Sequence, residues 1–541
     1  MVTGLGAPDR RGAGGARFAV LVVALASAGG VLAQAPQAPL PAAPPPAPVF
    51  TIKAFQVSGE NPLGDAETRR VLEPFQRQAT LDTLQQATAA LEAVLRTRGY
   101  GLHRVVLPPQ EVGETVRLEI VKFTLSKVVV EGNARYSVEN VRRALPELRE
   151  GESPNFKRLA VQTAIANENP NKQLQVALRE SEEPDRIDAA ITVKESQPWS
   201  LGASLSNAGS ESTGRDRLTL TAGHTNLFDR DHQFLAAYTT SVERSQDVKQ
   251  LGLSYRVPLY AAGAVLGASY TRSDVVGNFG AFTSTGAGHT FGVSASWYLA
   301  PELGRRPYVT FALDDKVFDA TVIDGVPVGM ARRSRPLALG YAARIESDAA
   351  TWSYNLDLAA NLATGSHNDL ASYQNEDARI QTVRWKALRG GVSYAAPLAT
   401  TWMWSARAQF QYSPDVLISG EQFGLGGLGS VRGTRNDRPI TGDKGVFGSV
   451  EITTPELAAG LRLLGFVDAG WLANNRPNGA NKLASDRIAS VGAGLRYAKE
   501  PFAASLDYGR LVAGSRVAQS INAAAPQRGE DRLYVSLSWR F

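Results

Sequence analysis

The sequence contains no cysteine and few histidines, and each shortage excludes a class of site. None of its 541 residues is cysteine, so a disulfide framework, a cysteine-ligated zinc site and a thiol nucleophile are excluded. The five histidines are scattered, and none forms a pair at a metal-ligand spacing such as HExxH. We therefore expect no metal, no cofactor and no enzymatic activity; a serine hydrolase in particular would need a histidine base beside its nucleophile.

The net charge is small, and long apolar runs are also missing after the N-terminal segment. The formal net charge is only +5, which by itself does not decide for or against a nucleic-acid partner, and we expect none. After the first 33 residues there is no apolar run of about 18 residues, the length that indicates a membrane-spanning helix. If the mature chain lies in a membrane, it must therefore cross it as a closed β-barrel, which satisfies every backbone group internally.

The N-terminus has the parts of a secretory signal peptide. Arg10, Arg11 and Arg17 are followed by an apolar stretch at 18–28 and by small residues before Gln34. The alternative is a membrane anchor, but residues 18–33 are fewer than the roughly 20 that a spanning helix needs. We predict a signal peptide at 1–33, followed at 34–49 by a stiff linker rich in proline and alanine.

Residues 50–195 show the same order of predicted elements twice. The first copy has a strand at 50–57, helices at 65–75 and 81–98, and strands at 102–107 and 115–123. The second copy has a strand at 125–131, helices at 137–144 and 153–167, and strands at 173–179 and 186–194. This β-α-α-β-β repeat predicts two small α/β domains, at 50–124 and 125–196.

From Trp199 onward, helical periodicity gives way to long alternating segments. In 404–412, for example, Trp, Ala, Ala, Phe and Tyr alternate with Ser, Arg, Gln and Gln. About 16 such segments of roughly 8–14 residues predict an antiparallel transmembrane barrel at 197–541. A soluble β-sandwich also alternates, but its strands are usually only about 5–6 residues long. A dry sandwich core would also leave the many inward Arg, Asp and Gln side chains unpaired, whereas a water-filled lumen hydrates them.

A glycine-rich segment at 422–435 reads QFGLGGLGSVRGTR. It formally matches the dinucleotide-binding pattern G-x-G-x-x-G, but that site requires a βαβ unit, and here both flanks are predicted barrel strands. The better interpretation is a long loop at about 413–443 whose glycines let the backbone approach the barrel wall and whose tip carries Arg432. The alternative is a mobile surface loop.

A second motif, Phe466-Val467-Asp468-Ala469-Gly470, lies on a later predicted strand. Phe466 and Asp468 share one face of that strand, so a lipid-facing Phe466 would place a carboxylate in lipid. A bulge, or a register in which both face the lumen, is therefore required. A lumen-facing Asp468 needs a partner, and Arg432 on an inward loop would supply a charge-assisted hydrogen bond.

Together these motifs resemble the transporters of two-partner secretion, in the superfamily that also contains the barrel-assembly factors. The repeat resembles two POTRA domains. The remaining matches are Val431-Arg432-Gly433 with the family loop motif, the 466–470 motif with its partner, Asp443, Gly445 and Glu451 with a following D-x-G…E pattern, Asn167, Asn169 and Pro170 with an NxNP element, and Phe541 with a terminal assembly signal. The chain departs from the family at Thr434, where an aromatic residue is usual, and residues 34–49 are too short and proline-rich for the family's plug helix.

The resemblance implies a protein of the Gram-negative outer membrane whose POTRA domains lie in the periplasm. Its implied partner is a large secreted protein with an N-terminal secretion domain, of the adhesin, haemagglutinin or haemolysin type, which crosses through the barrel. Outer-membrane lipid and the barrel assembly machinery are further implied partners, and no cofactor or ATP is implied. The alternative is a factor that inserts other barrels, although two POTRA copies and the NxNP element favour export.

Overall fold

The computed structural model describes residues 49–111, 113–210, 213–323, 326–399 and 401–541. The predicted signal peptide and the predicted linker up to residue 48 lie outside the described residues. No helix among the described residues is both long enough and apolar enough to cross a membrane.

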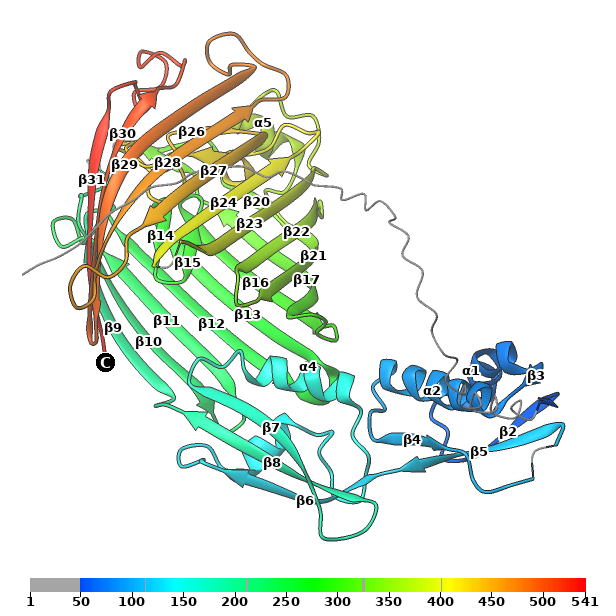
Figure 1. The fold of residues 1–541 in the computed structure, drawn as a ribbon. Coiled ribbons are helices and arrows are strands. Elements are labelled where there is room, and N and C mark those ends of the chain that lie inside the picture. The colour runs from blue at the N-terminus through cyan, green and yellow to red at the C-terminus, as the bar shows by residue number, and fades with distance from the viewer. Residues whose placement is uncertain (1–48, 112, 211–212, 324–325, 400) are drawn as a thin grey trace, which may run out of the picture. The chain divides into compact units, whose positions relative to one another are not determined.

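Two small α/β domains precede the barrel, and the α-helices and main-sheet strands of both follow the predicted order (Figure 1). The first contains β1 (Phe50–Thr51), β2 (Ala54–Gly59), α1 (Gly64–Leu72), η1 (Glu73–Phe75), β3 (Gln78–Ala79), α2 (Leu81–Thr97), β4 (His103–Val106) and β5 (Thr115–Lys122). The second contains β6 (Thr124–Glu131), α3 (Val138–Ala144), α4 (Phe156–Ala166), β7 (Lys172–Glu180) and β8 (Arg186–Glu195). The sheets have the orders β2-β5-β4 and β6-β8-β7, so each domain has two edge strands.

Each domain has its own core, and local sequence explains the helix ends. On α2, Leu84, Ala87, Leu91 and Leu95 are fully buried, as the helical spacing predicts. The predicted strand at 50–57 is two strands instead, because β1 pairs with β3 and only β2 joins the main sheet. Helix α4 begins after Asn155 and not at Ser153, because the Asn155 side chain accepts hydrogen bonds from Lys157 N and Arg158 N.

The barrel is closed, antiparallel and 16-stranded, as predicted. Its strands follow chain order around the wall (Figure 1): β9 (Trp199–Ser206), β10 (Arg217–Leu227), β11 (His232–Thr240), β12 (Lys249–Leu259), β13 (Ala264–Ser273), β16 (Gly288–Tyr298), β17 (Arg305–Phe318), β20 (Arg332–Ser334) with β21 (Pro336–Glu346), β22 (Thr351–Asn361), β23 (Lys386–Leu398), β24 (Trp402–Tyr412), β27 (Lys444–Thr453), β28 (Leu461–Ala473), β29 (Ser485–Lys499), β30 (Phe502–Ala513) and β31 (Asp531–Arg540). β20 and β21 count as one strand because both pair with β17, and β31 closes the barrel against β9.

Alternation sorts the side chains of each strand between lipid and lumen. On β28, Val467 is 55% exposed on the outer face, whereas its neighbours Phe466 and Asp468 are 4% and 0% exposed. The strand pairs regularly with β27 and β29 through this segment, so no bulge is present. Of the two arrangements that the sequence allows, the structure therefore has the lumen-facing register.

Smaller elements lie in the loops between barrel strands. They are η2 (Tyr260–Ala262), β14 (Gly277–Phe279), β15 (Phe282–Ser284), β18 (Thr321–Ile323), β19 (Val326–Val328), α5 (Leu370–Glu376), η3 (Ser419–Glu421), β25 (Phe423–Leu425) and β26 (Ile440–Gly442). The last three belong to the segment 413–443 between β24 and β27, which the sequence predicts to fold inward.

Candidate functional site

The loop at 413–443 lies inside the barrel and packs on its inner wall. β25 and β26 pair with each other to form a short hairpin. Leu425, Val431 and Ile440 of the loop are buried in one apolar cluster with wall residues Phe447, Leu472, Ile488 and Leu511. The loop is thus held by hydrophobic contact as well as by polar contacts.

Arg432 at the loop tip is joined to Asp468 on β28 by three hydrogen bonds. Arg432 Nε donates to Asp468 Oδ2 at 2.7 Å, and Nη2 donates to Oδ1 at 2.8 Å. The backbone N–H of Arg432 donates to the same carboxylate at 3.1 Å. The two residues are 2% and 0% exposed, so this bidentate pair is removed from solvent.

Further groups surround the Arg432 guanidinium. Nη1 lies 2.6 Å from Glu451 Oε1 and 3.8 Å from Asp507 Oδ1, and the ring centroid of Phe466 lies 3.4 Å from Cζ. We call Arg432, Glu451, Phe466, Asp468 and Asp507 the Arg432 cluster. In this cluster the Arg432 guanidinium faces three carboxylates on the barrel wall and the ring of Phe466. Loss of the guanidinium would leave the three carboxylates to repel one another at low local dielectric.

Glycines give the loop room to approach the wall. A Cβ on Gly445 would lie 2.2 Å from Phe423 Cδ1, and one on Gly470 would lie 2.5 Å from Leu425 Cδ2. Gly433 has a φ of +102°, and a Cβ there would lie 2.9 Å from the Gly509 carbonyl oxygen. Gly433 is therefore required by close backbone approach, whereas Gly445 and Gly470 leave room for the loop side chains Phe423 and Leu425.

Asp443 fastens the end of the loop. It is fully buried, and its carboxylate accepts hydrogen bonds from Leu417 N and Asn475 N, each at 2.8 Å. Asp443 thereby connects the start of the loop, the end of the loop and the segment after β28. Thr434, where the family usually has an aromatic residue, is also fully buried; its hydroxyl accepts from Gly427 N at 2.7 Å and stabilises the glycine turn.

Sequence reasoning missed a second ion-pair site at the base of the loop. Glu421 is 2% exposed and lies 3.2 Å from Lys316 Nζ and 2.8 Å from Arg389 Nη2. The only sequence signal was an acidic residue just ahead of the glycine-rich stretch. The loop is therefore held by charge at both its tip and its base.

Asn167 and Asn169 do not belong to the Arg432 cluster; they lie in the second α/β domain, where it contacts the barrel. Asn167 accepts from Leu174 N at 2.7 Å and donates to Leu174 O at 3.1 Å, which holds the turn before β7. Asn169 is 2% exposed and donates to the carbonyl of Thr225 on β10 at 3.0 Å. Pro170 is exposed beside them. The element therefore joins the domain to the barrel.

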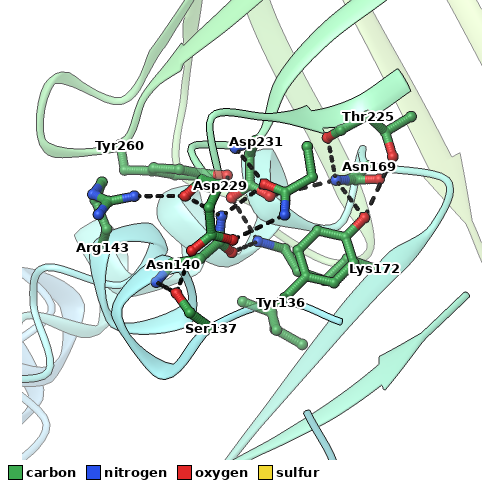
Figure 2. A network of polar contacts seen from close by, with 12 residues as sticks. Tyr136, Ser137, Asn140, Arg143, Asn169, Lys172, Thr225, Asp229, Asp231 and Tyr260 are labelled. Carbon is green, nitrogen blue, oxygen red and sulfur yellow. Dashed lines mark hydrogen bonds and ion pairs between the residues drawn. The ribbon is translucent and has the colours of Figure 1, made fainter. Parts of the chain in front are cut away.

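A buried ion pair completes this junction (Figure 2). Lys172 and Asp231 are 0% and 2% exposed, and Lys172 Nζ lies 2.5 Å from Asp231 Oδ2. The ammonium also donates to Asn140 Oδ1 at 2.7 Å, and the Tyr260 hydroxyl donates to the Asp231 carboxylate at 2.8 Å. Burial lowers the pKa of Lys172, and the Asp231 carboxylate opposes that effect.

Phe541 follows β31 at the end of the chain. It is 57% exposed, its backbone N–H donates to Leu201 O at 2.9 Å, and its ring lies 4.3 Å from that of Trp539. Among the described residues, no group of three or more His, Asp or Glu is placed to hold a metal ion. The arrangement is that of a barrel with a fastened internal loop and an α/β domain joined to it by buried polar contacts.

Comparison with known proteins places the chain in a family. The model of the haemolysin secretion/activation protein family ShlB/FhaC/HecB matches residues 185–497, and the ShlB-type POTRA domain matches residues 50–122. The chain belongs to this family. It is therefore an outer-membrane transporter of two-partner secretion, and the predicted resemblance is confirmed.

Individual relatives agree with this assignment. The chain is 23% identical over 443 residues to the outer membrane transporter CdiB of Dickeya dadantii (strain 3937), covering 79% of this chain and 77% of the relative. It is 24% identical over 445 residues to CdiB of Escherichia coli, covering 79% and 73%. Solved structures of CdiB from Escherichia coli and Acinetobacter baumannii superpose with TM-scores of 0.73 and 0.70, at 19% and 16% identity, covering 93% of both chains in the first case and 92% and 90% in the second. These structures show the same fold.

Proposed function

We propose that this transporter recognises its secreted partner through the two POTRA domains and passes it, as an extended chain, through the barrel lumen. The observation that carries the proposal is a polar cavity of about 760 Å³. Its lining includes Asn167 and Glu168 of the second POTRA domain as well as the inner barrel wall. A chain held by the POTRA domain is therefore already at the entrance of the lumen.

The POTRA sheets offer a physical means of recognition. Each three-stranded sheet leaves two edge strands, β2 and β4 in the first domain and β6 and β7 in the second. An extended segment of the partner can add to such an edge by main-chain hydrogen bonds, which need little sequence specificity. This mode fits a partner that must stay unfolded until it has crossed the membrane.

The Arg432 cluster has a positioning role in this proposal. It holds the tip of the 413–443 loop against β28, so that the loop occupies a defined part of the lumen while the partner passes. Residues Val431, Gly433, Gly445 and Gly470 provide the packing and the space, and Asp443 holds the end of the loop. No bond-breaking chemistry is assigned to any of these residues.

The remaining partners follow from the outer surface and the terminus. Exposed Leu, Val, Trp and Phe side chains on the outer faces of the strands contact outer-membrane lipid. Phe541, at the end of the strand that closes the barrel, is the proposed signal for the barrel assembly machinery. Both proposals concern how the protein reaches and occupies its membrane.

The test separates export from barrel insertion. Cells that lack this protein should retain the secreted partner in the periplasm, and plasmid-borne wild type should restore its release. If a large secreted protein is encoded beside the transporter gene, that protein is the partner used. Normal release without the transporter would contradict export, and a general loss of other outer-membrane barrels would instead indicate an assembly factor.

A further inference from the structure

Two cavities that are lined by several charged side chains adjoin inside the barrel. The first, of about 760 Å³, is lined by Glu168 of the second POTRA domain and by barrel residues from Arg256 to Gln409. The second, of about 500 Å³, is lined by Arg432, Glu451 and Asp507 of the Arg432 cluster. Both are lined by Ser353, Ser393 and Arg407. The two cavities therefore share one stretch of wall, which lies between the POTRA entrance and the Arg432 cluster.

Taken together, the linings of the two cavities carry more positive than negative groups. Their cations are Arg256, Arg306, Arg344, Arg407, Arg432 and Arg496, and their anions are Glu168, Glu451 and Asp507. Most of these charges are already paired: Arg256 with Glu168, Arg496 with Asp507, and Arg432 within its cluster. Arg306 and Arg344 both pair with Glu346, which is not part of the lining.

Arg407 is the exception. Within the described part of the chain, its guanidinium has no hydrogen bond and no ion pair within 4.0 Å; it lies over the face of Phe447, at 5.2 Å from the ring centroid, and the carboxylates of Glu451 and Asp468 act on it only at longer range. On β24 it lies opposite Ser393 on one side and Ser449 on the other, both too small to cover it. Arg407 thus presents guanidinium donors to the shared part of the two cavities, where no protein acceptor meets them.

We infer that Arg407 is a docking site for acidic side chains of the extended segment in transit. The inference rests on the proposed function and names the chemistry that the lumen selects. A guanidinium recognises carboxylates through paired N–H donors. A hydrogen bond between these charged groups is about twice as strong as one between neutral groups. An extended chain presents side chains on one face at every second residue, about 6.6 Å apart. The excess of cations along the path disfavours a basic segment at the same place.

If Arg407 only packs against Phe447, a different result is expected. Packing on Phe447 would account for its aliphatic stem and its orientation. A purely structural Arg407 would leave the affinity of the lumen for peptides independent of their charge, and its replacement would alter barrel stability alone. Charge preference and its loss on substitution therefore distinguish the two readings.

The test measures binding of short peptides to the full chain in detergent. Three fluorescent peptides of equal length, alternating Ser with Asp, with Asn or with Lys, are titrated and followed by anisotropy. Wild type should bind the Asp peptide about tenfold more tightly than the Asn peptide, and the Lys peptide most weakly. Arg407→Gln should remove the preference for Asp over Asn, and Arg407→Lys should keep most of it.

The matched control is Arg487→Gln. Arg487 lies opposite the outward-facing Trp471, so this variant loses the same charge outside the cavities and should bind all three peptides as wild type does. Heat-modifiable mobility checks that every variant is folded. Equal binding of the Asp and Asn peptides by wild type, or an unchanged preference in Arg407→Gln, would overturn the inference even if export proceeds. Charge-selective binding without export of the secreted partner would instead overturn the proposed function.

Discussion

Replacement of Arg432 by alanine should release the tip of the internal loop and leave the barrel assembled. The change leaves Asp468, which is fully buried, without its cation, and Glu451 and Asp507 lose the same neighbour. Removal of one partner of a buried ion pair costs about 3–5 kcal/mol. The loss of the contact with Phe466, at 3.4 Å, acts in the same direction.

We expect this free-energy cost to act on the docking of the loop and not on the assembly of the barrel. β28 pairs with β27 and β29 through its backbone, without the Arg432 side chain, so we expect this pairing to persist in the variant. Undocking of the loop, in contrast, lets water reach Asp468. A cost of about 3 kcal/mol lowers the ratio of docked to undocked loop by about 100-fold, since each 1.36 kcal/mol is a factor of ten.

Two measurements test this prediction. The chain has no native cysteine, so Val431→Cys introduces one thiol at a fully buried loop position. That thiol should resist maleimide in the otherwise wild-type protein and react in Arg432→Ala. Secreted partner per inserted barrel should fall in Arg432→Ala and in Asp468→Ala. The double variant should be no worse than either single one, because each single variant already breaks the Arg432–Asp468 pair.

Arg435→Ala is the matched control. It removes the same charge from the same loop, but the Arg435 side chain is exposed and should not hold the loop. Full export by both single variants of the Arg432–Asp468 pair would refute the positioning role. Loss of the inserted barrel in Arg432→Ala would refute the claim that the cost falls on loop docking.

Three further predictions concern the junction, the terminus and the arm. Lys172→Met should leave Asp231 buried without a cation, weaken the junction by about 3–5 kcal/mol and speed proteolysis between residues 195 and 199; unchanged proteolysis would contradict this. Deletion of Phe541 should reduce heat-modifiable protein in outer membranes, and normal insertion would count against an assembly signal. Residues 50–195 should retain the secretion domain of the partner in a pull-down, whereas retention by the barrel alone would argue against recognition by the arm.

The barrel was predictable from the sequence because alternation directly reports which way each side chain faces. A run such as 404–412 needs no tertiary information to be recognised as a wall strand. The facing of Phe466 was not predictable in the same way, since an aromatic residue suits both lipid and a packed lumen. The contact that accounts for a lumen-facing Phe466 comes from the loop, because the Arg432 guanidinium lies over the Phe466 ring.

Pairs between distant elements explain what the sequence did not reveal. The partnership of Arg432 with Asp468 was anticipated because a carboxylate on a wall strand needs a cation. Lys172 and Asp231 gave no such signal, since each is an ordinary polar residue at the end of a strand or in a turn. Their burial arises only when the second POTRA domain meets the barrel, and no local period encodes that contact.

Cross-linking in transit tests the path of the exported chain most directly. In this cysteine-free background, a single thiol is placed at Ser393, which lines both cavities, or at Val467, which is 55% exposed on the outer face. This thiol is labelled with a photoreactive reagent, which cross-links to a chain that lies beside it. The secreted partner is stalled in transit by a folded, disulfide-closed domain at its C-terminus. The account predicts that the stalled partner cross-links at Ser393→Cys and not at Val467→Cys. Export that continues with cross-linking at Val467→Cys, and with none at Ser393→Cys, would contradict passage through the lumen.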